Sequence, residues 1–271
     1  MSEIPASIII VCFLTAFINW VNVVIISTRI VGVQTRKVAS SNSVFNIIAL
    51  AANVAGATQA PLLAKTIEKS IIEGHQPYNF LFRLIIFSAT IGSIAGAFSI
   101  PSLHRILKKG VESLYRQQSV LKVITASLRP SSFAKIKQHL AFPNRENFRR
   151  LSSYQDMPVK LLVINILVYG FITISILSCL YAGYLNPLLR TTALSLNGVA
   201  LGLGTLGMML FIEPFNSILV DKVIDGAVTE GYMRKYFAFV AIARVLGTIL
   251  GQFLFIPMAH VIIFIAEIIK I

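Results

Sequence analysis

The sequence predicts an all-α integral membrane protein with six transmembrane helices. Hydrophobic residues make up 56% of the 271 residues and charged residues only 13%, with a mean hydropathy of +0.78. Soluble domains carry about 25% charged residues. A membrane helix needs about 20 apolar residues to cross a hydrocarbon layer of about 30 Å, and charged residues bound six windows of at least that length. These windows are Ile4–Thr28, Val38–Ala64, Leu84–His104, Leu161–Leu189, Thr191–Ile212 and Val245–Ala266.

The first window is predicted to be a retained helix rather than a cleaved signal peptide. Glu3 stands where a signal peptide carries basic residues, and the apolar run is longer than a signal peptide needs. The two cysteines, Cys12 and Cys179, both fall inside windows. They therefore predict neither a disulfide framework nor a metal site, and we expect both to pack in the interior.

Sequence motifs for cofactor chemistry are absent. The chain has no GxxxxGK[ST] phosphate loop and no HExxH zinc motif, and His75, His104, His139 and His260 are far apart. We therefore predict no cofactor, no metal and no enzymatic activity, and an ATP-driven pump is not supported.

The distribution of positive charge predicts the orientation in the membrane. Residues 105–160 contain twelve lysines and arginines against three acidic residues, and Arg29–Lys37 contains three more basic residues. A six-span arrangement places both segments on the same side, and cytoplasmic loops collect Lys and Arg. We therefore predict that both termini lie outside and the long basic loop inside.

The same charge predicts contact with anionic membrane lipids. Each basic residue near the surface contributes about 1 kcal/mol of attraction to anionic headgroups. Because topology accounts for most of the net charge of +13, no nucleic-acid partner is expected. Helix-like pieces of the loop, such as Gly110–Leu128, are expected to lie along the inner surface with their apolar side toward the headgroups.

Similar sequence segments occur in the same order in the first and second halves of the chain. "GSIAGAFSIPSLH" at Gly92–His104 returns as "GTILGQFLFIPMAH" at Gly247–His260, and "TRKVASSN" at Thr35–Asn42 is echoed by "LRTTALSLN" at Leu189–Asn197. The sequence thus predicts a three-helix half at 1–104, a basic cytoplasmic loop with amphipathic helices at 105–160, and a second three-helix half at 161–271. Halves with an odd number of spans insert in opposite orientations, as in many transporters, although a duplicated structural protein is an alternative.

The second window is unusually polar for a membrane span. It contains Asn46, Asn53 and Gln59, and an unpaired polar group in hydrocarbon costs several kcal/mol. These side chains are therefore expected to face the bundle or a wet cavity.

Three GxxxG pairs are expected to let helices approach closely within the monomer, and a homodimer interface is the alternative. These pairs are Gly92/Gly96, Gly198/Gly202 and Gly247/Gly251.

Five charged residues at the ends of the windows are candidate functional groups. Arg36 and Arg190 occupy matched positions in the repeat, and Arg83 stands at the entrance to the third window as an interface anchor or a functional group. Arg244 is an edge anchor if the last span begins at Val245, and lies inside the membrane if the repeat sets the register. Glu213, next to Pro214, is either an ion-pair partner or a functional carboxylate.

The segment Ser27–Lys65 resembles the opening signature of the Amj family, bacterial lipid II flippases that substitute for the MurJ type. The likeness lies in the "TRIVGVQTRKVA" turn, the following "S-x-FN" and the "QAPLL" at the helix end. The length, the six spans and the long basic loop agree with it. The resemblance implies a protein of the bacterial cytoplasmic membrane that moves lipid II, an undecaprenyl-diphosphate-linked peptidoglycan precursor, from the inner to the outer leaflet.

This implied activity assigns roles to the polar residues. Arginine suits a diphosphate through bidentate, charge-assisted hydrogen bonds, so Arg36, Arg190, Arg244 and Arg83 are the expected diphosphate ligands. Asn46, Asn53 and Gln59 are expected to line a wet path for the sugars and peptide, with Glu213 as ion-pair partner or proton site. The alternatives are an exporter of another polyprenyl-linked glycan or of a small anion, and a membrane scaffold that transports nothing.

Overall fold

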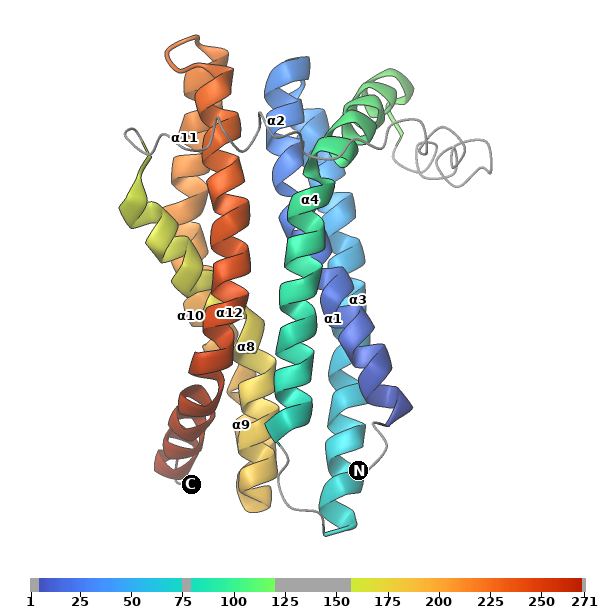
Figure 1. Cartoon of the computed structure of the whole chain (residues 1–271), viewed down its shortest axis with the longest axis vertical. Helices are drawn as coiled ribbons and strands as arrows, with labels where there is room; N and C mark the ends of the chain where they lie inside the picture. The colour runs from blue at the N-terminus through green and yellow to red at the C-terminus, as the bar shows by residue number, and fades with distance from the viewer. Residues whose placement is uncertain (1–4, 75–78, 120–156, 270–271) are drawn as a thin grey trace.

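The protein is a bundle of long helices (Figure 1). The computed structural model describes residues 5–74, 79–119 and 157–269, so most of the predicted basic loop lies outside the described residues. Six helical spans within these ranges are long and apolar enough to cross a membrane, and the described ranges contain no strand. The predicted fold class and number of spans are thus confirmed.

The first four helices belong to three spans, and the remaining elements to the other three. The elements are α1 (Ala6–Val24), α2 (Ile26–Thr35), α3 (Val38–Ile72), α4 (Asn79–Gln117), α8 (Val159–Leu185), η1 (Pro187–Leu189), α9 (Arg190–Ser195), α10 (Asn197–Gly207), η2 (Met208–Ile212), α11 (Glu213–Ile224) and α12 (Glu230–Ile268). Except for α8, the helical spans extend well past the charge-free windows, because a charged residue does not end a helix. The fifth span, Pro187–Ile224, begins with the 3₁₀ turn η1 and is interrupted by the π-helical turn η2.

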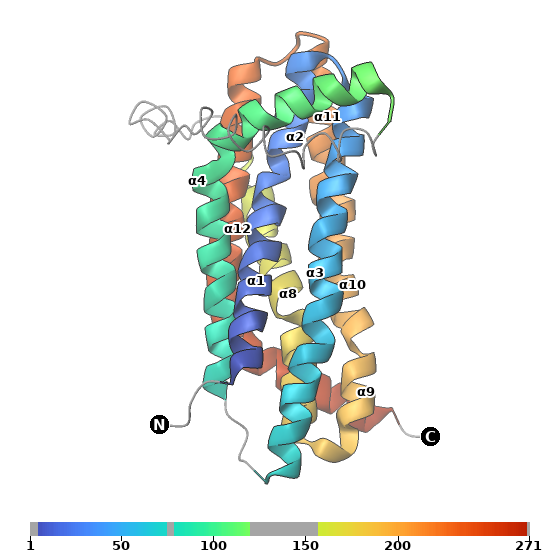
Figure 2. The ribbon, with the colours of Figure 1, turned by 90° about the vertical axis from the view of Figure 1, so that its right-hand side faces the viewer.

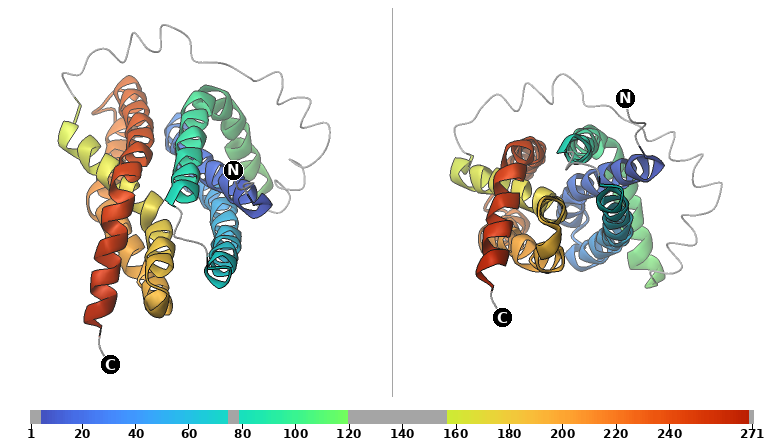
Figure 3. Two further views of the ribbon diagram at one scale, coloured as in Figure 1. Left: turned by 60° about the horizontal axis from the view of Figure 1, so that its bottom comes forward. Right: turned by 90° about the horizontal axis from the view of Figure 1, so that it is seen from below.

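The helices pack as two groups, here called the first half (α1–α4) and the second half (α8–α12). Within the first half α1 packs against α4 and α3, and within the second half α8 packs against α12 and α10. The view along the bundle in Figure 3 shows the two groups side by side. They meet chiefly where α4 packs against α12. The two halves therefore use corresponding helices for corresponding contacts.

Both ends of the chain lie at one end of the bundle. Figure 1 shows the start of α1 and the end of α12 together at the bottom, which we call the terminal end. The turn from α2 to α3 lies at the opposite end, called the Arg36 end. Arg36 adopts a left-handed conformation there with φ 53°, and the N–H of Lys37 donates to the Gly32 carbonyl at 3.0 Å. This arrangement is required if the termini share one side of the membrane.

Two of the three GxxxG pairs bring helices into close contact. Gly92 and Gly96 of α4 face the backbone of α1 at Ala16 and Trp20, and Gly247 of α12 faces the α8 carbonyl of Ile166. Gly251 also packs against α8, at Ile174. The third pair is different, since no atom within 4 Å would meet a side chain at Gly198 or Gly202. The expectation of close packing is therefore wrong for that pair.

A side chain at Gly92 is expected to separate α1 from α4. A Cβ there would lie 2.0 Å from the Ala16 carbonyl oxygen, so Gly92→Ala should lower the free energy of unfolding by about 1–3 kcal/mol through overpacking. The control is Gly198→Ala, which meets nothing and should be neutral or slightly stabilising, since alanine favours helix. Thermal unfolding of the detergent-purified variants measures both. Equal changes in the stability of the two variants would contradict the close packing of α4 against α1 at Gly92.

The end of α4 folds over the Arg36 end of the bundle. Pro101 lies inside α4, and Figure 2 shows the turns that follow it bent across α2 and α3. Leu107, Val111 and Leu114 are buried in a cluster with Val31 and Val44. The apolar side of this segment therefore packs on the first half, and the expectation that it faces the headgroups is wrong for residues 105–117.

Candidate functional site

A buried arginine lies in the interior between α12 and α8. Arg244 is 8% exposed and stands fourteen residues after the start of α12, about 21 Å along the helix. The structure thus has Arg244 inside the bundle rather than at the exposed edge of the last span. Its Cζ lies 4.3 Å from the centroid of the Tyr169 ring on α8, a cation–π contact.

Two nitrogen atoms of the Arg244 guanidinium have no hydrogen-bond partner among the described residues. Its Nε and Nη1 are buried, and neither makes a hydrogen bond in the part of the chain that the structure describes. Buried polar groups are nearly always hydrogen-bonded, and each unpaired donor costs about 1–3 kcal/mol. A fixed guanidinium with open donors in a partly polar interior is suited to binding an anion.

An ion pair between the halves lies next to this arginine. Arg29 of α2 donates from Nη2 to Oε2 of Glu213, the first residue of α11. The Arg29 side chain is 17% exposed and that of Glu213 is 35% exposed. Both residues are close enough to Arg244 to interact with it electrostatically. The first half therefore places a second positive charge, that of Arg29, near the buried Arg244 of the second half.

The irregular helix before Glu213 explains the position of this carboxylate. Pro214 has no N–H to donate to Leu210, and its ring clashes with a regularly placed carbonyl four residues earlier. The chain relieves this with the wider π-helical turn η2 (Met208–Ile212), a feature frequent at functional sites. Glu213 consequently starts a new helical segment that is aimed at α2.

A second polar network joins the halves at the Arg36 end. Gln34 of α2 donates to Glu230 of α12, and its side-chain oxygen lies 2.8 Å from Nε2 of His104 on α4. Glu230 also accepts from Arg234 at 2.6 Å. The network links both halves at the mouth of the bundle that lies nearest the predicted basic loop.

The other predicted arginines do not gather around Arg244. Arg36 is exposed at the turn between α2 and α3. Arg190 lies toward the terminal end and donates to Glu68 of α3 at 2.6 Å, another contact between the halves. Arg83 of α4 donates to the carbonyl of Gln252 at 3.1 Å, about 12 Å along α12 from Arg244. The four predicted arginines therefore occupy separate depths of the bundle.

The polar residues of α3 are divided between the interior and the surface. Gln59 is buried, whereas Asn46 and Asn53 are exposed. At helical spacing, Asn46, Asn53 and Glu68 fall on one stripe of α3, and Glu68 contacts Arg190 of the second half. Of these three residues only Glu68 contacts the second half, so the expectation that Asn46 and Asn53 face the interior of the bundle is wrong.

Several residues of these contacts are absent from the predicted site, among them Arg29, Glu68 and Tyr169. Arg29 looks like a loop residue because a charge ends the first window, yet it lies within α2. Glu68 likewise falls outside the second window. Tyr169 gives no sequence signal, since aromatic residues are frequent in membrane spans. The only usable signal is that Arg29 and Glu213, of opposite charge, each directly follow an apolar window.

The described part of the chain offers no cluster of metal ligands. No group of three or more His, Cys, Asp or Glu side chains comes together there. Cys12 and Cys179 are both free thiols, the second one buried. Around Arg244 the charged groups are Arg29 and Glu213, so with Arg244 itself the region carries one excess positive charge and suits an anion.

The sequence comparisons identify the family. The family model described as Amj, Alternate to MurJ, matches residues 14–266, which is nearly the whole chain. The chain belongs to the Amj family. The Lipid II flippase Amj of Bacillus subtilis (strain 168) is 30% identical over 257 residues, covering 93% of each chain. The Amj match includes Arg29, Tyr169, Glu213 and Arg244, while no solved structure matches significantly.

Proposed function

We propose that this protein is a lipid II flippase of the bacterial cytoplasmic membrane. Membership of the Amj family, a 30% identical relative with this name, and six apolar spans support this assignment. The substrate would move from the inner to the outer leaflet without chemical change. The protein is then a multi-pass transporter, and its polar groups serve binding instead of catalysis.

The observation that carries the proposed site is the pair of open donors on Arg244. Lipid II joins its sugar–peptide head to its polyprenyl tail through a diphosphate. A planar guanidinium gives bidentate hydrogen bonds to phosphate oxygens, so Nε and Nη1 of Arg244 would complete their bonding on this group. Arg29 lies near enough to add positive charge, while Glu213 holds Arg29 in place when no substrate is bound.

The remaining predicted residues fit a path around this central site. The exposed side chains of Asn46 and Asn53 on α3 would give the sugars and peptide hydrogen bonds outside the packed interior. Gln59 would continue the path in the interior, and Arg190 and Arg83 would attract the diphosphate toward the terminal end. Arg36 would attract it at the opposite mouth. The polyprenyl tail would stay in lipid throughout.

Alternating exposure of the site between the halves is the proposed mechanism. The paired contacts of α4 with α1 and of α12 with α8, each through a GxxxG face, support two inverted three-helix repeats. With both termini outside, the Arg36 end faces the cytoplasm, beside the basic loop. The network of Gln34, Glu230 and His104 would then open to admit substrate, and the Arg190–Glu68 pair would open to release it.

Depletion of the resident lipid II flippase tests the assignment. In a bacterium without other lipid II flippases, this chain is expected to restore growth and outer-leaflet lipid II, whereas its Arg244→Gln variant should not. Immunoblotting of the membrane fraction controls for insertion of both proteins. A correctly inserted chain that leaves outer-leaflet lipid II unrestored would overturn the proposal. Rescue of another polyprenyl-linked glycan alone would reassign the substrate.

A further inference from the structure

Tyr236 of α12 joins the start of α11 to the interior of the second half. Its side chain is completely buried, and its hydroxyl donates a hydrogen bond to Oδ1 of Asn216 at 3.0 Å. The Phe215 ring packs against the Tyr236 ring, with the two centroids 5.1 Å apart. Phe215 and Asn216 are the third and fourth residues of α11. Two of the first four residues of this helix therefore contact the same tyrosine.

The start of α11 depends on such contacts because its backbone is irregular. The π-helical turn η2 precedes it, and Pro214 has no N–H to donate to that turn. Side-chain contacts therefore have to fix the direction in which α11 leaves the turn. Glu213, the first residue of α11, lies on the same side of the helix as Asn216, because the two are three residues apart. The contact that holds Asn216 consequently also sets the position of the Glu213 carboxylate.

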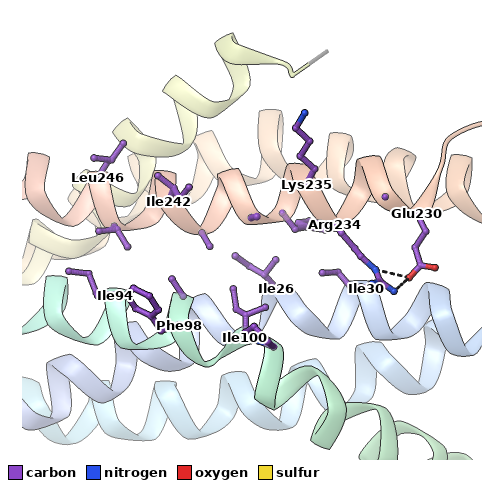
Figure 4. A pocket seen from close by; sticks show the side chains of 17 residues that line it. Ile26, Ile30, Ile94, Phe98, Ile100, Glu230, Arg234, Lys235, Ile242 and Leu246 are labelled. Atoms are coloured by element: carbon purple, nitrogen blue, oxygen red, sulfur yellow. Dashed lines mark hydrogen bonds and ion pairs between the residues drawn. The ribbon is translucent and has the colours of Figure 1, made fainter. Parts of the chain in front are cut away.

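Tyr236 lies on the same side of α12 as the buried arginine. Tyr236, Val240 and Arg244 are spaced by four residues and are all buried, which places them on one stripe of the helix. The opposite side of α12 lines an apolar groove of about 620 Å³ between α4 and α12, with Ile242 and Leu246 on its wall (Figure 4). Neither Tyr236 nor Arg244 lines that groove. The tyrosine therefore belongs to the interior, together with the arginine.

The charged groups of the proposed diphosphate site surround the Tyr236 phenol. Three of them are close enough to interact with it electrostatically, namely Arg29, Glu213 and Arg244. Glu213 in turn holds Arg29 through the ion pair between the halves. A continuous series of contacts thus leads from the Tyr236 hydroxyl through Asn216 and the first turn of α11 to the ion pair.

We infer that Tyr236 is a positioning residue for the diphosphate site. The inference rests on the proposed function, because the groups that it positions are those that would bind the substrate there. The hydroxyl holds Asn216 and thereby the start of α11, so that Glu213 keeps Arg29 beside Arg244. Without the hydroxyl the start of α11 is held only by ring packing, and the ion pair weakens.

A double-mutant cycle in the Tyr236→Phe background tests the inference. Phenylalanine keeps the ring contact with Phe215 and removes only the hydroxyl, so the protein should remain folded. We expect the coupling energy between Arg29 and Glu213, measured by thermal unfolding of the detergent-purified full chain, to fall about twofold or more. Tyr181→Phe is the matched control, since it removes the hydroxyl of another buried tyrosine, on α8, and should leave this coupling unchanged.

The same measurements separate a positioning role from a structural one. A tyrosine that only stabilises the fold would lower the unfolding temperature of Tyr236→Phe and leave the coupling between Arg29 and Glu213 intact, and this result would overturn the inference. Asn216→Leu removes the other partner of the hydrogen bond and should reduce the coupling as much as Tyr236→Phe does. An intact coupling in Asn216→Leu would also overturn it.

Transport provides a second readout. In reconstituted vesicles, Tyr236→Phe should raise the lipid II concentration for half-maximal transport about fivefold, the factor that corresponds to one ordinary hydrogen bond. Tyr181→Phe should not change this concentration. An unchanged concentration in an active Tyr236→Phe protein would overturn the inference. A coupling energy that falls as expected in a chain without any transport would preserve the positioning of the ion pair and reject the transport proposal.

Discussion

Replacing Arg244 by methionine is expected to abolish transport without destabilising the protein. Two charge-assisted hydrogen bonds to the diphosphate, about 1.5 kcal/mol each, correspond to at least a hundredfold loss of substrate affinity. The folded protein, in contrast, loses two unpaired buried donor atoms, one cation–π contact and the attraction of Arg244 to Glu213. Because these terms partly cancel, the free energy of unfolding should stay unchanged or rise by about 1 kcal/mol.

The opposite signs of these effects distinguish a binding role from a structural one. A structural arginine with satisfied bonds would cost stability when removed, and activity would fall with the amount of folded protein. Transport assays on reconstituted vesicles and thermal unfolding of the same preparations provide the two readouts. Arg244→Lys keeps the charge but loses the bidentate geometry, so we expect an intermediate loss of transport. Lys222→Gln, at an exposed position of α11 with no assigned role, controls for a general loss of positive charge. Full transport by Arg244→Met would reject the site.

The sequence predicts the spans well because hydropathy is a local property. A run such as Leu161–Leu189 has no alternative to a membrane helix, and α8 covers most of it. Helix ends are less predictable, since helices such as α12 begin well before the charge-free window, here at Glu230 instead of Val245, and include charges. The same limitation hides Arg29. Its charge ends the first predicted window and so places it in a loop, whereas the structure places it within helix α2.

Contacts between helices depend on information that a single sequence does not contain. Gly92/Gly96 and Gly198/Gly202 have the same spacing, yet only the first pair faces another helix. Rotation of each helix about its axis decides this, and rotation is set by the packed neighbours. For the same reason the sequence marks Arg244 as a candidate but does not predict its contact with Tyr169 or its open donors.

Separation of Arg29 from Glu213 is expected to cost about 2 kcal/mol of unfolding free energy. The value lies between those of exposed pairs, at most about 1 kcal/mol, and fully buried pairs, about 3–5 kcal/mol, because both side chains are partly exposed. Glu213→Gln leaves Arg29 without a partner near a second guanidinium, that of Arg244. Arg29→Gln leaves the carboxylate unpaired, although Arg244 still attracts it.

The double variant decides whether Glu213 acts chiefly as a partner of Arg29. If the pair is a strut between α2 and α11, Arg29→Gln with Glu213→Gln should restore at least half of the stability lost in Glu213→Gln, because no unpaired charge remains. Thermal or denaturant unfolding of all four proteins gives the coupling energy. The Glu68–Arg190 pair also joins the halves, and because its side chains are only slightly more exposed, at 41% and 23%, its coupling energy should be similar or slightly smaller. Additive losses in the Arg29–Glu213 cycle would show that the carboxylate acts independently, as a proton site would.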